Sequence, residues 1–160
     1  MSQNPDQSIP DHAGVAFKPP VLLLIFIVIG FACRLFIPLN FLPRPWPLIL
    51  GPLIIVAALA LFITTVRTMS GAQTGIDPDS GTAVILKSGP FRISRNPIYL
   101  SMVFLLIGIG ISANTLWFIG LAIVFFFLLS WGVISREELY LEKKFGEDYL
   151  SYKGEVRRWL

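Results

Sequence analysis

Apolar residues in this chain come in long unbroken runs, and not in the alternating or helical-face patterns that are typical of soluble domains. The first two runs cover residues 21–39 and 48–66, and the third extends over residues 98–134. A helix of about 20 apolar residues crosses the hydrocarbon core of a bilayer. The pattern therefore predicts an integral membrane protein built from transmembrane helices, with the lipid bilayer as its first partner.

Polar interruptions divide these runs into hairpins. The prolines of "NFLPRPWP", residues 40–47, end one helix and begin the next. The third run is too long for a single helix, and "SANT", residues 112–115, divides it by a tight turn. We therefore predict an all-α polytopic fold with four transmembrane helices, arranged as a hairpin over residues 21–66 and another over residues 98–134.

Three polar segments complete the predicted organisation. Residues 1–20 form a leader, residues 67–97 a connection between the hairpins, and residues 135–160 a helical C-terminal segment. Gly146 is suited to a helix C-cap. Beyond it four apolar or aromatic residues recur at helical spacing, which predicts a helix on the membrane surface: Tyr149, Tyr152, Val156 and Trp159.

The placement of basic residues predicts how the chain is oriented in the membrane. The chain has 13 Lys and Arg against 10 Asp and Glu, and the basic residues concentrate in the three polar segments. The opposite side has only Arg44, with Arg34 near its boundary. Basic residues gather on the cytoplasmic side of membrane proteins, so both termini are predicted to be cytoplasmic. This placement differs from a uniform basic surface for nucleic acid, so no nucleic-acid partner is expected.

The composition narrows the possible chemistry. Cys33 is the only cysteine, and His12, in the leader, is the only histidine. A disulfide framework, a CxxC site, histidine catalysis and histidine-based metal binding are therefore not expected, and no metal site is predicted.

Two features of the third predicted helix are candidates for binding. "RNPIY" begins at Arg95, where the arginine could simply anchor to lipid phosphate, Pro97 could start the helix, and Tyr99 could be an interface aromatic. "GIG" contains Gly108 and Gly110. Such small residues usually permit close helix packing, although they could also admit a flat cofactor ring.

A pair of carboxylates follows the last apolar run. Glu137 and Glu138 are adjacent, and adjacent helical positions differ by about 100°, so the two side chains cannot face one partner. One could face inward and the other could pair with Arg136 or a basic loop residue. A solvated helix start is the ordinary alternative. Together, the basic loop, the small residues and the carboxylates could enclose an anionic, ribose-bearing cofactor.

The order and spacing of these motifs resemble the superfamily of isoprenylcysteine carboxyl methyltransferases and phospholipid N-methyltransferases. That superfamily carries "GPYrxxRHPxYxG", a span rich in small residues, and "EExxLxxxFGxxYxxYxxxVxR". This chain reads "GPFRISRNPIYLS", "GIG" and "EELYLEKKFGEDYLSYKGEVRRW", and "TGIDP" at residues 74–78 resembles the preceding loop. The likeness covers about residues 70–160. Asn96 replaces the family histidine, and Ser101 replaces a glycine.

The resemblance implies S-adenosylmethionine as methyl donor, bound on the cytoplasmic side between the last two spans and the C-terminal segment. Arg95, Asn96 and Tyr99 would position the reactants, with no catalytic residue assigned. The implied cofactor-binding residues are Gly89, Arg95, Asn96, Pro97, Tyr99, Gly108, Gly110, Glu137, Glu138, Tyr149, Tyr152 and Arg157.

Methyl transfer from a sulfonium is an in-line displacement that depends on alignment, which can be worth about 7–11 kcal/mol. A carboxylate acceptor needs no base, whereas an amine must lose a proton and no histidine is available to take it, so a lipophilic carboxylate is favoured. Two alternatives stay open: an NADPH-dependent membrane lipid or sterol-type reductase, and a non-catalytic membrane protein that retains the fold. The sequence leaves the acceptor and the oligomeric state open.

Overall fold

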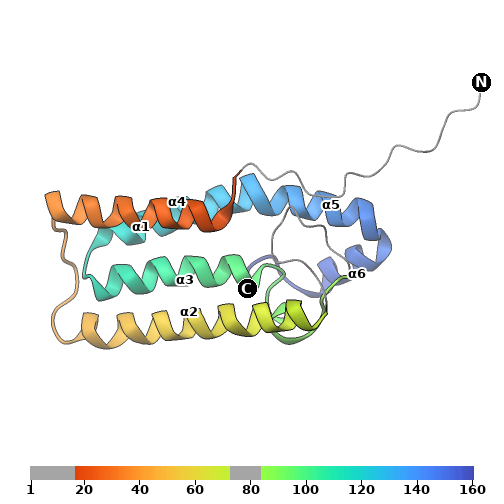
Figure 1. Cartoon of the computed structure of the whole chain (residues 1–160), viewed down its shortest axis with the longest axis horizontal. Coiled ribbons are helices and arrows are strands. Elements are labelled where there is room, and N and C mark those ends of the chain that lie inside the picture. The colour runs from red at the N-terminus through yellow and green to blue at the C-terminus, as the bar shows by residue number, and fades with distance from the viewer. Residues whose placement is uncertain (1–16, 73–83) are drawn as a thin grey trace, which may run out of the picture.

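The computed structural model describes residues 17–72 and 84–160, and every regular element in these two ranges is helical. Figure 1 shows the elements in chain order, which are α1 (Pro19–Phe36), α2 (Trp46–Gly71), the 3-10 helix η2 (Gly89–Arg92), α3 (Pro97–Ser112), α4 (Leu116–Leu129), the π-helix η3 (Ser130–Ile134), α5 (Ser135–Phe145) and α6 (Glu147–Glu155). The all-α prediction is confirmed for this part of the chain. Most of the predicted leader and the "TGIDP" loop lie outside the described residues.

Among the residues that the structure describes, three helices are long and apolar enough to cross a membrane: α1, α2 and the continuous helix Leu116–Phe145. The chain is accordingly an integral membrane protein. The helix α3 is apolar but has only 16 residues, and a span of the hydrocarbon core usually needs about 20. Whether α3 spans the membrane as a fourth helix therefore stays a prediction.

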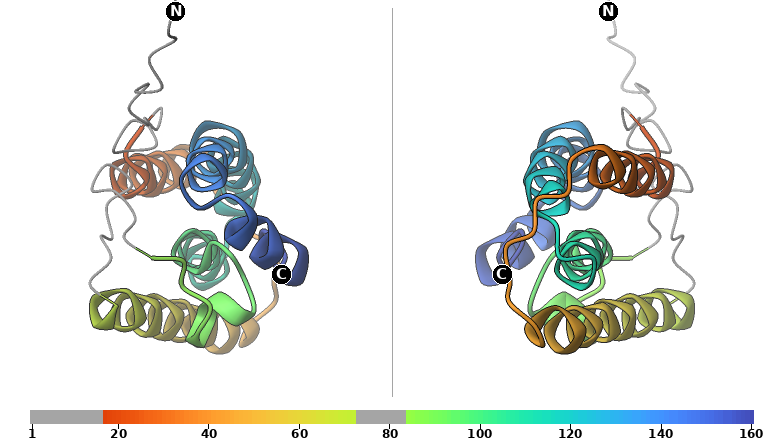
Figure 2. Two further views of the ribbon diagram at one scale, coloured as in Figure 1. Left: turned by 90° about the vertical axis from the view of Figure 1, so that its right-hand side faces the viewer. Right: turned by 90° about the vertical axis from the view of Figure 1, so that its left-hand side faces the viewer.

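The helices alternate in direction, so the start of α3 and the end of α4 meet at the same end of the bundle (Figure 1). There α5 and α6 continue the chain beyond the apolar helices. In cross-section α3 lies between α2 and α4, and α1 packs mainly on α4 (Figure 2). Leu106, Phe118, Phe125 and Leu129 form the fully buried centre of the core. The bundle thus fixes the start of α3 beside the helix that follows α4.

The second helix is longer than the sequence predicted. It reaches Gly71, so residues 67–71, which were assigned to the polar connection, are helical. Its threonines are accommodated within the helix, because Thr64, Thr65 and Thr68 donate their hydroxyls to carbonyls one turn earlier at 2.7–2.8 Å. A hydroxyl that bonds to its own helix does not force the helix to end.

Two glycines bring α2 and α3 into close contact. A Cβ added at Gly51 would lie 2.4 Å from the backbone nitrogen of Ser112, and one added at Gly108 would lie 3.0 Å from the backbone nitrogen of Ile55. Real side chains do not fit at such distances. Small residues that let two backbones approach are a common means of helix association in membranes.

The turn between α3 and α4 is clamped to the loop that joins α1 to α2. Asn114 adopts a left-handed φ of 47°. Its Oδ1 accepts hydrogen bonds from the backbone nitrogens of Phe41 (3.2 Å) and Leu42 (2.9 Å), and its Nδ2 donates to the Leu42 carbonyl at 2.9 Å. Trp117 adds a fourth bond by donating its Nε1 to the Ile37 carbonyl at 2.8 Å. One asparagine therefore joins the two hairpins at this end.

We expect Asn114→Ala to lower the free energy of unfolding by about 2–3 kcal/mol, because three hydrogen bonds are lost at roughly 1 kcal/mol each. Thermal unfolding of the detergent-purified protein measures the change. Asn114→Gly is the matched control, since it tolerates the positive φ but lacks the amide. A melting temperature for Asn114→Ala equal to that of the wild type would contradict the role of this clamp.

The predicted helix through Trp159 is wrong in its extent, and its position on the membrane surface stays a prediction. The helix α6 ends at Glu155, and Val156 is extended with φ −119° and ψ 132°. Tyr149 and Tyr152 are buried within the protein. The physical reason is that the carbonyls after residue 156 bond to the start of α3 in place of a continued helix.

Candidate functional site

A glycine and two prolines shape the segment that precedes α3. Gly89 has φ +57°, a conformation that side chains other than glycine's rarely adopt. It opens η2, which has a proline in its first turn, and Pro97 opens α3 in the same way. The hydroxyl of Tyr152 on α6 donates to the Phe91 carbonyl at 2.7 Å. The segment is therefore held against α6.

Three successive residues of this segment bind the extended C-terminal tail, residues 156–160. The backbone nitrogen of Arg95 donates to the Arg157 carbonyl at 3.0 Å. The Asn96 Nδ2 donates to the Arg158 carbonyl at 2.9 Å, and the Ser94 hydroxyl donates to the same oxygen at 3.3 Å. The tail is thus fixed along the start of α3 by both backbone and side-chain bonds.

A buried carboxylate lies between two guanidinium groups at this point. The Glu138 side chain is 5% exposed. Its Oε1 lies 3.1 Å from the Arg95 Nη2 and also accepts from the Arg158 Nε at 3.1 Å, while its Oε2 accepts from the Arg158 Nη2 at 2.5 Å. The bonds to Arg158 are bidentate, which is the strong form of this pairing. Residues from α5, the α3 start and the tail therefore meet at one charged cluster.

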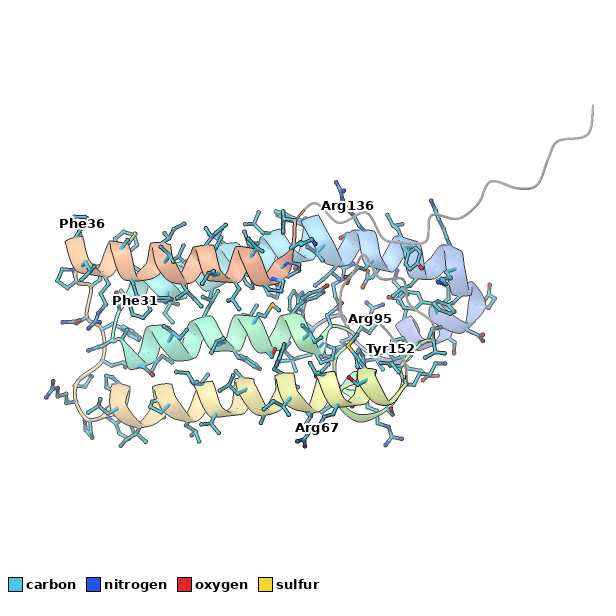
Figure 3. All side chains as sticks on the ribbon, viewed as in Figure 1. Phe31, Phe36, Arg67, Arg95, Arg136 and Tyr152 are labelled. Atoms are coloured by element: carbon cyan, nitrogen blue, oxygen red, sulfur yellow. The ribbon has the colours of Figure 1, made fainter. Side chains whose placement is uncertain are left out.

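The neighbouring carboxylate has a different partner. Tyr99, in the first turn of α3, donates its hydroxyl to Glu137 Oε1 at 2.5 Å. Since Glu138 pairs with arginines, the prediction that the two glutamates face different partners is confirmed. Both nevertheless lie beside the start of α3, because their partners are Tyr99 and Arg95. Figure 3 labels Arg95 and Tyr152 in this region of the molecule.

Two buried tyrosines line the α6 side of the cluster. Burial raises the pKa of Tyr152 to about 12. Burial, with the nearby charge of Glu138, also raises the pKa of Tyr149. Both phenols are therefore neutral at physiological pH and act as hydrogen-bonding groups without adding negative charge.

The tail is further anchored on the last turn of α4. Trp159 stacks on Phe126 with ring centroids 4.5 Å apart, and its Nε1 donates to the Ser130 hydroxyl at 3.2 Å. Ser130 begins the π-helix η3. Single π-turns inside α-helices occur frequently at functional sites.

Comparison with known proteins shows to which family of membrane proteins this chain belongs. Residues 46–148, more than half of the chain, match the phospholipid methyltransferase family. The chain belongs to this family. A protein of Haemophilus influenzae described as uncharacterized is 42% identical over 64 residues, which are 39% of this chain and the whole of that protein. No solved structure matches the chain.

The structure brings together most of the site residues that the sequence predicted for this phospholipid methyltransferase-family protein. Around the start of α3, α5, α6 and the tail lie Arg95, Asn96, Pro97, Tyr99, Glu137, Glu138, Tyr149 and Tyr152. Gly89 opens η2, where a Cβ would lie 3.0 Å from the Thr68 hydroxyl on α2. Their roles in binding a cofactor stay predictions.

The two glycines of α3 lie elsewhere. Gly108 is 11 positions after Pro97, so it lies about 16 Å further along the helix. It contacts α2, and a Cβ at Gly110 would lie 2.6 Å from the Cβ of Phe118 on α4. Helix packing accounts for both residues. Their predicted role in admitting a cofactor stays a prediction.

The tail arginine that contacts Glu138 is Arg158, while the predicted role of Arg157 in cofactor binding stays a prediction. The Arg157 side chain is exposed, and only its carbonyl takes part. Arg158 reaches Glu138, and the "VxR" spacing of the methyltransferase pattern, counted from Val156, marks this arginine. Ser94 and Trp159 were also missed, because their roles depend on the tail folding back.

Proposed function

We propose that the protein transfers a methyl group from S-adenosylmethionine to a lipophilic acceptor, at the end of the bundle where α3, α5 and the tail meet. The observation that carries the proposal is the placement of Glu137 and Glu138 beside the start of α3, one bonded to Tyr99 and one to Arg95. Membership of the phospholipid methyltransferase family supports the reaction class.

The chemistry of this donor set fits the cofactor. S-adenosylmethionine presents ribose hydroxyls and an ammonium, which bind carboxylates, and a carboxylate, which binds a guanidinium. Both kinds of group are present here, because Glu137 and Glu138 lie in the first turn of α5 and Arg95 lies two residues before the start of α3. The bound cofactor would supply the activated methyl group, and the protein would supply its alignment.

The protein would accelerate the reaction by positioning the cofactor and the acceptor. Methyl transfer needs the acceptor atom in line with the breaking carbon–sulfur bond, and no protein nucleophile is required. The tail and the two buried tyrosines would exclude water from the reacting atoms. An acceptor with an apolar body could approach from the bilayer, since the cluster lies directly beyond the apolar helices.

Two classes of acceptor group, carboxylates and amines, are compatible with the proposal. The sequence favoured a carboxylate because no histidine base was available. The family match does not support that preference, since it is to phospholipid methyltransferases. Glu137 could take the proton of an amine directly or through water. Amine-bearing phospholipids are therefore to be tested beside prenylated carboxylates.

The test is binding of S-adenosylmethionine by calorimetry and transfer of labelled methyl groups to the two acceptor classes. We expect binding in the micromolar range by the wild type. We expect Glu137→Gln to weaken binding about tenfold, because an amide replaces the carboxyl group that would accept hydrogen bonds from the cofactor. Glu142→Gln is the matched control, since it makes the same change on α5 at a more exposed carboxylate that pairs with Lys153.

Three results would contradict the proposal. If the protein binds NADPH but not S-adenosylmethionine, a reductase is favoured, and if it binds neither, a non-catalytic protein is favoured. If Glu137→Gln binds S-adenosylmethionine with unchanged affinity, Glu137 is not part of the binding site. The thermal unfolding midpoint of each variant shows whether it is folded.

A further inference from the structure

A wider turn interrupts the helix that carries the two glutamates. The helix Leu116–Phe145 is continuous, but residues 130–134 within it form the π-helix η3. The backbone nitrogen of Ser135 donates to the carbonyl of Ser130, which lies five residues earlier, whereas an α-helix bonds to the carbonyl four residues earlier. This turn therefore contains one residue more than an α-helical turn.

The extra residue changes which side chains face the protein. Before the turn, the buried positions follow α-helical spacing, at Phe118, Ala122, Phe125 and Leu129. In an unbroken α-helix, the position seven after Leu129 would continue this buried side, and the position nine after it would lie on the opposite side. The structure shows the reverse, because Arg136 is exposed and Glu138 is only 4% exposed. The π-turn has therefore rotated the following helix by one residue position, or about 100°.

This rotation determines which side chains reach the start of α3. Without the extra residue, Arg136 would take the place of Glu137 beside the Tyr99 hydroxyl. Glu137 would then take the place of Glu138. Glu138 would move to the place of Leu139, which is 58% exposed. The pair of carboxylates at the proposed site therefore depends on the π-turn.

The side chain of Ser135 is placed to hold this turn open. Its hydroxyl donates to the Ser130 carbonyl at 2.7 Å, so that carbonyl accepts both the hydroxyl and the backbone nitrogen of Ser135. A serine in an α-helix bonds to a carbonyl three or four residues earlier. A bond to the carbonyl five residues earlier fits the wider turn, and it is lost if the turn tightens to an α-helical one.

We propose that Ser135 is a positioning residue for the methyl-transfer site. Its hydroxyl stabilises the π-turn, and the π-turn rotates Glu137 and Glu138 toward the start of α3. The inference rests on the proposed function, because it gives the turn the task of aligning the proposed cofactor site. Ser135 acts through the helix backbone and is not itself a ligand of the cofactor.

The first test removes the extra residue. Trp131 lies in the π-turn and is 71% exposed, so its deletion lets the turn become α-helical while Glu138 keeps its side of the helix. We expect this deletion variant to fold and to bind S-adenosylmethionine with wild-type affinity, as measured by calorimetry.

A deletion elsewhere in the same helix is the matched control. Ile123 is 56% exposed but lies in the regular part of α4. The loss of one residue there rotates Phe118 away from the side that Phe125 occupies, and both of these side chains are fully buried. The Ile123 deletion should therefore fail to reach the native fold.

The second test removes the hydroxyl. We expect Ser135→Ala to lower the affinity for S-adenosylmethionine about fivefold, which is the effect of one ordinary hydrogen bond, because more molecules adopt the α-helical turn. Adding the deletion of Trp131 to Ser135→Ala should restore the affinity, since the shortened helix needs no π-turn. Adding Trp131→Ala, which keeps the chain length, should not restore it. A purely structural loss would not respond to the deletion in this way.

The third test measures the rotation without any cofactor. In a Cys33→Ala background, Leu139→Cys supplies a single thiol at an exposed position, and its rate of reaction with a water-soluble maleimide is measured in detergent. Ser135→Ala should slow this reaction, because residue 139 then takes the place of Tyr140, which is 7% exposed. Unfolding would speed the reaction instead. The added deletion of Trp131 should restore the wild-type rate.

Two results would overturn the inference. One is unchanged affinity and unchanged labelling in Ser135→Ala. The other is a Trp131 deletion variant that does not fold, or that does not bind S-adenosylmethionine although the wild type does. If the wild type itself does not bind S-adenosylmethionine, the proposed function fails, and the labelling rates still decide whether Ser135 sets the rotation of the helix.

Discussion

Glu138→Ala is expected to abolish S-adenosylmethionine binding and to lower the free energy of unfolding by about 3–5 kcal/mol. The stability loss arises because removing one partner of a buried ion pair leaves an uncompensated charge. Here Arg95, which is 8% exposed, would lose its ion-pair partner, and Arg158 would lose both bonds that tie the tail to α5. Thermal unfolding and calorimetry measure the two effects.

A double variant separates binding from folding. In Arg95→Met with Glu138→Met, apolar residues of similar size replace the buried pair, and such exchanges are often neutral for stability. We expect the stability to recover while binding stays lost. Glu142→Ala is the matched control, because Glu142 pairs with Lys153 at a more exposed position, where ion pairs contribute little. Wild-type binding by the double variant would refute the placement of the ligand at this cluster.

Gly51→Leu is expected to separate α2 from α3 and to prevent the protein from reaching its native fold in detergent. The added Cβ would lie 2.4 Å from a backbone nitrogen and 2.6 Å from the Cα of Ser112, which belong to the opposing helix backbone and cannot rotate away. Overpacking of a well-packed core costs about 1–3 kcal/mol, and more where backbones must move apart.

The same substitution at another glycine serves as the control. A Cβ at Gly120 on α4 would meet nothing within 4 Å, and this residue is exposed on the bundle surface. Gly120→Leu should therefore leave the monodisperse yield and the melting temperature unchanged. Equal behaviour of the two variants would show that the close contact between α2 and α3 is not required for folding.

Hydrophobic patterning and local signals determined most of the fold. The apolar runs predicted the helices α1 to α4, the "SANT" residues predicted the turn between α3 and α4, and Gly146 predicted the end of α5, where its nitrogen donates to the Glu142 carbonyl. These features depend on residues close in sequence, so one-dimensional reasoning reaches them. Adjacent helical positions also predicted that Glu137 and Glu138 would have different partners, and they do.

Only the tertiary structure determined which residues from distant parts of the sequence contact one another. Helical spacing favoured an α-helix through Trp159, but the start of α3 offers Asn96 and the Arg95 nitrogen as donors, and the tail carbonyls bind those instead. For the same reason Arg158 was missed as the partner of Glu138. The close fit of Gly108 against Ile55 likewise became visible only once α2 and α3 were side by side. A sequence motif indicates which residue types a site needs. The ion-pair partners of buried charges, and the residues that pack against small side chains, follow from contacts between segments that are distant in sequence.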